Sequence, residues 1–395
     1  MNVLTPEMQA FVRKHENDDI HKLALQASKY PNIDISLAMR QIEGRQVAKQ
    51  KLPLWYGMED ILYPKHISLE QCSSEATAKY KSTLFSGGVA IDLTGGMGVD
   101  ISFISKSFEK AICIERDKEL TEIVSHNFGV LGLNNISVIN TESESYLHSI
   151  DEVELIYIDP ARRDDTGKKV VMIEDCSPDL IRLDSMLNRK AKSVMIKLSP
   201  MLDISQAVKA LSHVTDIHVI SYNNECKELL LIKNPKSASS MQLFHCVNIR
   251  KDGEMEMFTF EREDENIEIP YAVKMEEYLY EPNSSLLKAG AYRVVAKRYD
   301  LHKLHPNSHL YTSDELYPDF QGRIFRVNSV TSLNKKELKK HLVAIHQANV
   351  AVRNFPMSVD ELRKRLKLKD GGNTYIFATT TFDNQKILTL CSKIS

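Results

Sequence analysis

The sequence lacks several features that would assign the protein to other classes. Its apolar runs fall short of the ~18–20 residues that a membrane-spanning helix needs, so we expect no membrane partner. No basic stretch followed by an apolar core stands near the N-terminus, so we expect no secretory signal. The six cysteines are scattered without a C-x-x-C pair, which favours reduced thiols in the cytoplasm over a disulfide framework.

Strong net charge and abundant tryptophan are also missing. The formal net charge is -2, so a nucleic-acid partner would have to meet a local basic surface. The single tryptophan, Trp55, follows a helical stretch, and we expect it to anchor that stretch onto the next domain. What is present, 43% hydrophobic and 26% charged residues, is typical of a globular protein, and 395 residues allow two or three domains.

Between residue 89 and about residue 233, apolar and β-branched stretches alternate with stretches of helical length. This alternation predicts an α/β fold with a mostly parallel, doubly wound sheet. Only a short turn at 223–226 separates the last two strands, so they should form an antiparallel hairpin. The seven expected strands are 89–93, 111–115, 136–140, 154–158, 193–198, 215–221 and 228–233.

Smaller parts are expected on both sides of this sheet. The N-terminal stretch reads as helices, the first of them capped by Thr5, and a further helix is expected over 68–81. After two short strands at 244–250 and 256–262, a capped helix should run to about Tyr299. From residue 323 the order βαβαββ predicts a small α+β module. The expected domains are a helical lobe at 1–65, the α/β domain at 66–235, a third segment at 236–320 and a fourth at 321–395.

The most informative stretch, 89–100, reads as a buried strand, a glycine turn and the start of a helix. Glycine removes the Cβ that would keep backbone N–H groups away from a ligand. Asp92, just before the turn, disfavours a pyrophosphate and suits a ligand with an ammonium group. The next strand ends in Glu115, ~20 residues beyond the turn, where Rossmann-like folds bind ribose hydroxyls. The glycines are Gly95, Gly96 and Gly98.

These two motifs resemble motifs I and II of the class I S-adenosylmethionine (SAM) methyltransferases, which have a Rossmann-like fold. The resemblance implies that SAM is the cofactor, with Asp92 taking its ammonium and Glu115 its ribose hydroxyls. Glu142, at the end of the third strand, can accept from the adenine amino group, although Glu144 lies close to it in the same polar loop. The expected cofactor-binding residues are Asp92, Thr94, Gly95, Gly96, Gly98, Glu115, Arg116, Glu142, Ser143 and Asp159.

The fourth strand ends in Asp159-Pro160, which places a carboxylate beside the point where open α/β sheets bind ligands. This resembles the D-P-P-Y motif of amino methyltransferases, in which the acid and a backbone carbonyl accept hydrogens from the target amine. Ala161 and Arg162 stand where that motif has a second proline and an aromatic residue. The departure leaves the target atom open.

Two arginines after this motif, Arg162 and Arg163, could clamp a phosphate or a carboxylate of the substrate. Alternatively, they pair with the aspartates at 164 and 165. The fifth strand ends on the same rim, where Lys197 and Ser199 could face the acceptor. The expected catalytic residues are Asp159, Pro160 and Arg162, and the expected substrate-binding residues are Arg162, Arg163, Lys197 and Ser199.

Two further sets of residues do not support a separate chemistry. Cys176 does not match the Pro-Cys arrangement of pyrimidine C5 methyltransferases, so we expect a small buried residue there. His302, His305 and His309 suggest a metal by number alone. They occupy a proline-containing loop with no cysteine nearby, so we expect no metal site.

Basic residues cluster on both helices of the C-terminal module. Such helices are usually solvated faces, but two of them beside a methyltransferase favour RNA as a partner. With the segment 275–315, they resemble a bacterial family of class I methyltransferases that ends in a ferredoxin-like piece (here 236–320) and a THUMP-like domain (here 321–395). THUMP domains are RNA-binding modules of RNA-modifying enzymes. The motifs that carry this resemblance are Gln71-Cys-Ser-Ser-Glu75, Asp159-Pro-Ala-Arg162 and Glu281-Pro-Asn283.

The sequence therefore predicts a SAM-dependent methyltransferase that acts on structured RNA, tRNA or rRNA, with the C-terminal modules docking the RNA. One alternative is the same catalysis on a protein or a small acidic metabolite, with the two arginines as its clamp. Another is a catalytically idle SAM-binding RNA module. The modified nucleotide, the methylated atom and the oligomeric state stay open at this level.

Overall fold

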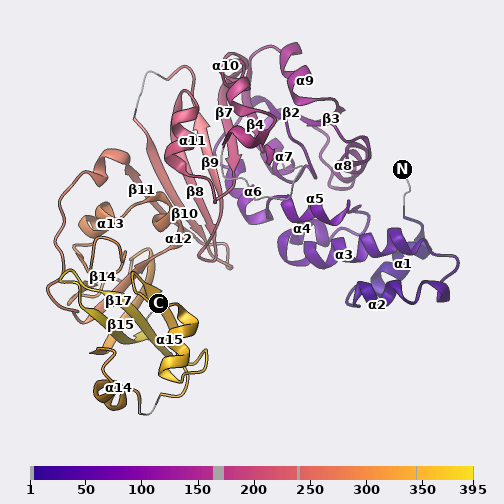
Figure 1. Ribbon diagram of the computed structural model, residues 1–395. Helices are drawn as coiled ribbons and strands as arrows, with labels where there is room; N and C mark the ends of the chain where they lie inside the picture. Colours follow the sequence, from indigo (N-terminus) through magenta and orange to yellow (C-terminus); the bar gives the residue numbers. More distant parts are fainter. Residues whose placement is uncertain (1–3, 163–172, 238–240, 344, 395) are drawn as a thin grey trace. The chain divides into compact units, whose positions relative to one another are not determined.

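The structure is a computed structural model that describes residues 4–162, 173–237, 241–343 and 345–394 (Figure 1). Its chain divides into two compact units. The first comprises residues 1–217 and 228–240, and the second comprises residues 218–227 and 241–395. Within the described ranges, no helix is long and apolar enough to cross a membrane.

The chain begins with short helices whose first turns are capped by side chains. Thr5 caps α1, as expected, by accepting the N–H of the residue three positions on. The sequence predicts one helix over 68–81, but the chain forms two. Cys72 is extended, and Ser74 caps the second helix by accepting the N–H of Thr77. The bounds are α1 Pro6–Lys14, α2 Ile20–Ala24, a 3-10 turn at Ala27–Lys29, α3 Ile35–Lys51, α4 Pro53–Tyr56, α5 His66–Gln71 and α6 Glu75–Ser82.

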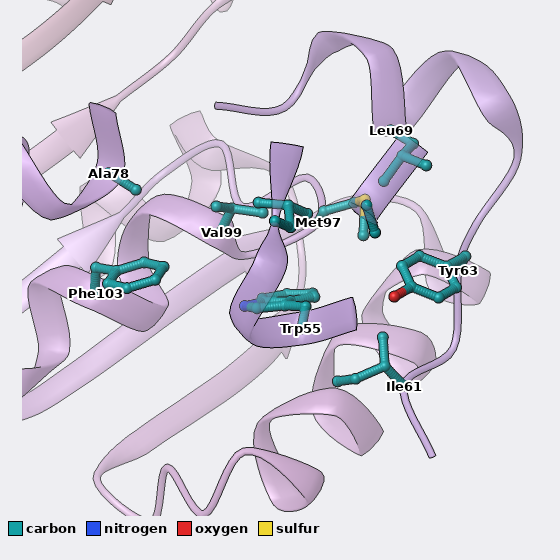
Figure 2. Packing of buried hydrophobic residues seen from close by; sticks show 10 residues of the cluster. Trp55, Ile61, Tyr63, Leu69, Ala78, Met97, Val99 and Phe103 are labelled. Atoms are coloured by element: carbon teal, nitrogen blue, oxygen red, sulfur yellow. The ribbon is translucent and has the colours of Figure 1, made fainter. Parts of the chain in front are cut away.

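Trp55 anchors these helices to the α/β domain, which confirms the expectation for this residue. Its side chain is completely buried (0% exposed) and belongs to one apolar cluster with Met97, Val99 and Phe103. Figure 2 shows the indole ring below Met97 and Val99, with Phe103 on one side and Tyr63 on the other. The N-terminal helices therefore pack directly on the glycine turn and on the helix that follows it.

The α/β part of the chain is built on a mixed sheet. Strands β7, β4, β1, β2 and β3 lie side by side in this order and are all parallel, which agrees with the mostly parallel sheet predicted from the sequence. Strand β9 joins β7 antiparallel. Because β2 and β4 lie on opposite sides of β1, the strand order reverses beside β1, which is where such sheets bind ligands. The bounds are β1 Gly87–Asp92, α7 Val99–Ile104, a 3-10 turn at Ser105–Ser107, β2 Phe108–Glu115, α8 Lys118–Val130, β3 Ile136–Asn140, α9 Ser143–Ser149, β4 Val153–Ile158, β5 Ala161–Arg162, a 3-10 turn at Ile173–Asp175, β6 Cys176–Ser177, α10 Leu180–Lys190, β7 Ala191–Leu198, α11 Ile204–Ala210, β8 Val214–Tyr222 and β9 Glu225–Lys233.

This sheet has nine strands where the sequence predicts seven, and its full order is β11-β10-β8-β9-β7-β4-β1-β2-β3. The two additional strands, β10 (Leu243–Ile249) and β11 (Met255–Glu261), are the short strands expected at 244–250 and 256–262. Their positions are confirmed, but the expected number of strands in the sheet is wrong. A strand at an edge presents unpaired N–H and C=O groups to any further strand, and local hydrophobic patterning does not show which strand will pair with them.

The second unit contains a seven-stranded sheet in the order β13-β14-β12-β15-β18-β17-β16. Its C-terminal part has the expected βαβαββ order. The helix expected to run to Tyr299 is instead two helices, because the chain turns at Gly290, whose φ of +79° suits glycine. The bounds are a 3-10 turn at Arg262–Glu265, β12 Tyr278–Pro282, α12 Ser284–Ala289, α13 Arg293–Arg298, β13 His302–Lys303, β14 Tyr311–Ser313, β15 Gly322–Thr331, α14 Lys335–Leu342, β16 Asn349–Arg353, α15 Val359–Leu366, β17 Thr374–Thr380 and β18 Lys386–Lys393.

The Glu281-Pro-Asn283 motif holds this second sheet together from within. Glu281 is 3% exposed and accepts hydrogen bonds from Nε of Arg323 and Nη2 of Arg353, each at 2.7 Å. Asn283 caps α12 by accepting the N–H of Leu286 at 3.1 Å. The motif thus links β12 to β15 and β16, and its role in the fold is structural.

Candidate functional site

The glycine turn lies where β1 ends. A Cβ on Gly95 would lie 2.5 Å from Sγ of Cys113 and 3.0 Å from the carbonyl oxygen of Ile114, so only glycine fits against β2. Gly98 has a φ of +73°, and a Cβ there would lie 2.5 Å from Cζ of Phe128. Both positions require glycine, and the resulting bare backbone is what a turn that holds a ligand needs.

Glu115 connects the end of β2 to this turn. Its Oε2 accepts the N–H of Gly96 at 2.8 Å, and its Oε1 accepts the N–H of Asp117 at 2.8 Å. A carboxylate has about four lone-pair positions, so this partly exposed side chain can still accept hydroxyl donors. A carboxylate in this place can therefore serve the turn and a ribose together.

Asp92 and Thr94 connect the turn to the fourth strand. Asp92 is 1% exposed and accepts the N–H (2.9 Å) and the hydroxyl (3.3 Å) of Thr94. The same hydroxyl accepts the N–H of Asp159 at 2.6 Å. Burial, with added repulsion from Asp100 and Asp159, raises the pKa of Asp92 to about 8. The two motifs that the sequence singles out thus share one hydroxyl group.

Asp159 and Lys197 form an ion pair at neighbouring strand ends. Ile158 of β4 lies opposite Ile196 of β7, so Asp159 and Lys197 are the next residues along the two parallel strands. The ammonium of Lys197 donates to Oδ2 of Asp159. The side chains of Lys197 and Asp159 are 12% and 30% exposed, so the pair reaches the surface at the rim of the sheet. Burial alone would lower the pKa of Lys197, but the surrounding carboxylates, Asp159 foremost, outweigh burial and raise it.

The third strand end brings further predicted residues close to the turn. The hydroxyl of Ser143 donates to the carbonyl oxygen of Leu93 at 2.5 Å, which fixes the start of α9 beside the turn. Glu142 precedes it with an exposed side chain. Arg116 is also exposed, and its carbonyl oxygen accepts from Nδ2 of Asn140 at 2.9 Å.

The remaining predicted residues follow β4 and β7. Pro160 is buried, and Arg162 pairs with Cys176 in the small ribbon of β5 and β6. Cys176 is 4% exposed, which confirms the expectation of a buried residue. Arg163 lies outside the described residues, as do the two aspartates that follow it. Ser199 follows β7, and its hydroxyl accepts a backbone N–H two residues on at 3.3 Å.

A buried ionic network that sequence reasoning missed adjoins the Asp159–Lys197 pair. Lys81 is 0% exposed and forms ion pairs with Asp100 at 2.7 Å and with Glu228 at 2.9 Å. Ser73 and Tyr157 each donate a hydroxyl to Oδ2 of Asp100 at 2.7 Å. Glu228 lies within β9, directly before its apolar run, and this position is the sequence signal that points to a buried charge.

Comparisons with known proteins identify the class of enzyme. Two family models match the second unit, a THUMP domain-like model over residues 322–393 and a ferredoxin-like domain model over residues 278–320. A crystal structure from Porphyromonas gingivalis W83 with a methyltransferase assignment is 34% identical, with a TM-score of 0.86, and covers 100% of both chains. The chain belongs to this methyltransferase family, which ends in ferredoxin-like and THUMP-like domains.

More distant relatives name the cofactor. Two uncharacterized S-adenosylmethionine-dependent methyltransferases of Mycobacterium tuberculosis, from strains CDC 1551 / Oshkosh and ATCC 25618 / H37Rv, are each 24% identical over 305 residues. The match covers 76% of this chain and 80% of theirs. The protein is therefore a SAM-dependent methyltransferase.

Two other features of this methyltransferase involve none of the predicted site residues. Among the described residues, no group of three or more His, Cys, Asp or Glu could hold a metal ion. His302 instead bonds Glu276 at 2.9 Å, and His309 stacks on Tyr292 with ring centroids 3.7 Å apart. A cavity of about 520 Å³ lies between α3 and α8, and none of the predicted site residues lines it.

Proposed function

We propose that this methyltransferase modifies structured RNA, tRNA or rRNA, and that its THUMP-like domain docks the RNA. One observation carries the proposal: the THUMP-like match over residues 322–393 falls on a module whose two helices present exposed basic side chains. Such side chains bind the phosphate groups of a nucleic acid whatever its nucleotide sequence. The exposed residues are Lys335, Lys336, Lys339, Lys340, Lys364 and Arg365 on the helices, and Lys367 and Lys369 directly after the second helix.

Three carboxylates around the glycine turn suit the parts of the cofactor. SAM supplies a methyl group on a positively charged sulfur. Asp92, buried at the end of β1, takes the ammonium group, and Glu115 accepts the ribose hydroxyls while it keeps its bond to Gly96. Glu142, exposed before α9, accepts from the adenine amino group. The other residues of the proposed cofactor site are Thr94, Gly95, Gly98, Arg116 and Ser143.

Asp159 and its neighbours form the acceptor side of the proposed site. Asp159 stands beside the turn, because its N–H is bonded to Thr94, and its carboxylate faces the rim with Lys197. Pro160 fixes the backbone after it, and Ser199 lies at the next strand end. Arg162 and Arg163 follow in the chain as the proposed contacts to substrate phosphate.

The test compares RNA nucleosides from a strain that lacks the gene with those from its parent by mass spectrometry. We expect one methylated nucleoside to disappear and to return with the wild-type gene. A gene copy that carries Asp159→Ala should fail to restore it, because the acceptor side of the site then lacks its carboxylate. Asp151→Ala is the matched control, since Asp151 is an exposed carboxylate at the opposite end of β4. Unchanged RNA nucleosides in the deletion strain would refute the RNA substrate and favour a protein or metabolite.

A further inference from the structure

The acceptor side of the proposed site holds an ammonium group directly beside its carboxylate. The ammonium of Lys197 donates to Oδ2 of Asp159, and the carboxylates around it keep the lysine protonated. In the part of the chain that the structure describes, Lys197 is the group that bonds this carboxylate. Among the described residues Oδ1 has no hydrogen-bond donor, so it can take one proton from a substrate.

This charge suits some methyl acceptors and opposes others. An exocyclic amine attacks as a neutral group, and its nitrogen becomes positive as the bond to the methyl carbon forms. Lys197 would repel that charge. It would also occupy an oxygen of Asp159 that an amino group with two hydrogens could use. An acceptor that becomes negative before the attack is instead stabilised by the ammonium.

We propose that the methyl acceptor is a ring nitrogen that carries a hydrogen and is flanked by a carbonyl group, as in N1 of guanine or N3 of uracil. The inference rests on the proposed RNA substrate and names the atom that is modified. When such a nitrogen loses its proton, the negative charge spreads onto the carbonyl oxygen. Lys197 can hydrogen-bond that oxygen while Asp159 takes the proton, so each member of the pair has a separate role.

The step balances in atoms and charge. The ring N–H bond breaks and its proton passes to Asp159, from which it leaves to solvent, since this side chain is 30% exposed. The electron pair on nitrogen then forms the bond to the methyl carbon. The carbon–sulfur bond breaks, and its electron pair stays on sulfur, which becomes neutral. The overall change is one methyl group gained by the base and one proton released.

A second lysine on the same strand provides a matched control. Lys192 pairs with Glu154 at 2.7 Å, so it also joins β7 to β4, but at the opposite end of the strands. Its side chain is 54% exposed, and it lies away from the rim that carries Asp159. Lys192→Gln removes the same charge from the same strand and should leave methylation unchanged.

The experiment uses the full-length protein, SAM and total RNA from the deletion strain, and identifies the product nucleoside by mass spectrometry. We expect methylation at a ring nitrogen next to a carbonyl. At pH 7, Lys197→Gln should be slower by about 10²–10³-fold, as when one preorganised donor to a developing anion is removed. The deficit should shrink as the pH rises and the base ionises without help. Lys197→Arg should recover part of the rate, and calorimetry should show unchanged SAM affinity in both variants.

The possible outcomes separate the two proposals. Methylation of an exocyclic amine, a carbon or a sugar hydroxyl would overturn the assignment of the atom and leave the RNA substrate standing. If the loss of methylation rate in Lys197→Gln is the same at every pH, Lys197 only positions Asp159. That result would also overturn the assignment of the atom. If the wild-type protein binds SAM in calorimetry but methylates no RNA, the RNA substrate is refuted, and the atom assignment is refuted with it.

Discussion

Asp92 combines almost complete burial with a proposed charged ligand. Burial, with smaller effects from Asp100 and Asp159, raises its pKa from 3.8 to about 8. At pH 7 the free protein therefore holds this carboxyl group mostly neutral. An ammonium group placed beside it favours the carboxylate. If Asp92 takes the ammonium of SAM, cofactor binding must release a proton.

We therefore expect the affinity for SAM to rise between pH 5 and pH 7, by up to about tenfold per pH unit. An α-amino group keeps its proton below about pH 7.7, so the charge of the cofactor is nearly constant in this window. Asp92→Asn preserves the acceptor oxygen for Thr94 but cannot ionise, so its weaker affinity should not depend on pH. Titration calorimetry at both pH values measures this, and an equal rise in the variant would contradict the role of Asp92.

Folding stability gives a check on the same carboxyl group without any ligand. Its folded pKa of about 8 lies above the ordinary value of 3.8, so between these values the folded protein keeps a proton that the unfolded chain has lost. The free energy of unfolding of the wild type, relative to Asp92→Asn, should therefore fall as the pH rises through this range. Urea unfolding of both proteins at pH 5 and pH 8 should show the fall.

At the scale of the elements, Lys81 ties three parts of the first unit together. It lies in α6 and pairs with Asp100 of α7 and with Glu228 of β9, and all three side chains are buried. Burial would raise the pKa of Asp100, but the charges of Lys81 and Lys197, with the hydrogen bonds from Lys81 and Ser73, together outweigh burial and lower it. Asp100 is therefore charged in the folded protein, and the ammonium group that it shares with Glu228 is its direct ionic partner.

Lys81→Met should lower the free energy of unfolding by about 3–5 kcal/mol, because it leaves two buried carboxylates without their partner. Lys79 provides the control on the same helix. It pairs with Glu75 at 2.6 Å, but its side chain is 60% exposed, so Lys79→Met should change stability by less than about 1 kcal/mol. Urea unfolding at pH 7 compares the two variants. If Lys81→Met lowers the free energy of unfolding no more than Lys79→Met does, the buried network adds nothing measurable to the stability of the fold.

The elements that could be predicted from the sequence are those with a local signal. The expected strands between β1 and β9 were predicted correctly because their apolar runs end in turns. The helix breaks at Ser74 and Gly290 were missed, because each is a single capping residue inside a helical pattern. The position of Asp159 beside the glycine turn follows from the parallel sheet, since adjacent parallel strands end at the same edge. Lys81 and Glu228 are 147 residues apart, and no local pattern brings them together.

At the scale of the whole molecule, the proposed chemistry and the proposed RNA-docking helices belong to different units. The glycine turn, Asp159 and Lys197 lie in the first unit, and the basic helices α14 and α15 lie in the second. Arg363, another basic residue of α15, forms an ion pair with Asp370. Lys364, which is exposed on the same helix, is the better choice for a test.

Neutralising the basic face of the THUMP-like domain should weaken RNA binding and leave the cofactor site intact. Each phosphate contact contributes about -0.9 to the slope of log affinity against log salt on a duplex, and less on a single strand. A variant with glutamine at four exposed lysines should therefore raise the dissociation constant for RNA and flatten this slope, while SAM affinity stays unchanged. The four positions are Lys336, Lys340, Lys364 and Lys367.

Net charge by itself could mimic this result, so the control removes four exposed lysines from the first unit. They are Lys22, Lys106, Lys110 and Lys209. Because both variants lose the same charge, only a local RNA contact can make their salt slopes differ. Binding of one tRNA preparation, measured by fluorescence anisotropy across a salt series, gives both slopes. If the THUMP-like variant keeps the wild-type slope, or if the control loses as much of it, these helices are solvated faces and the RNA-docking role fails.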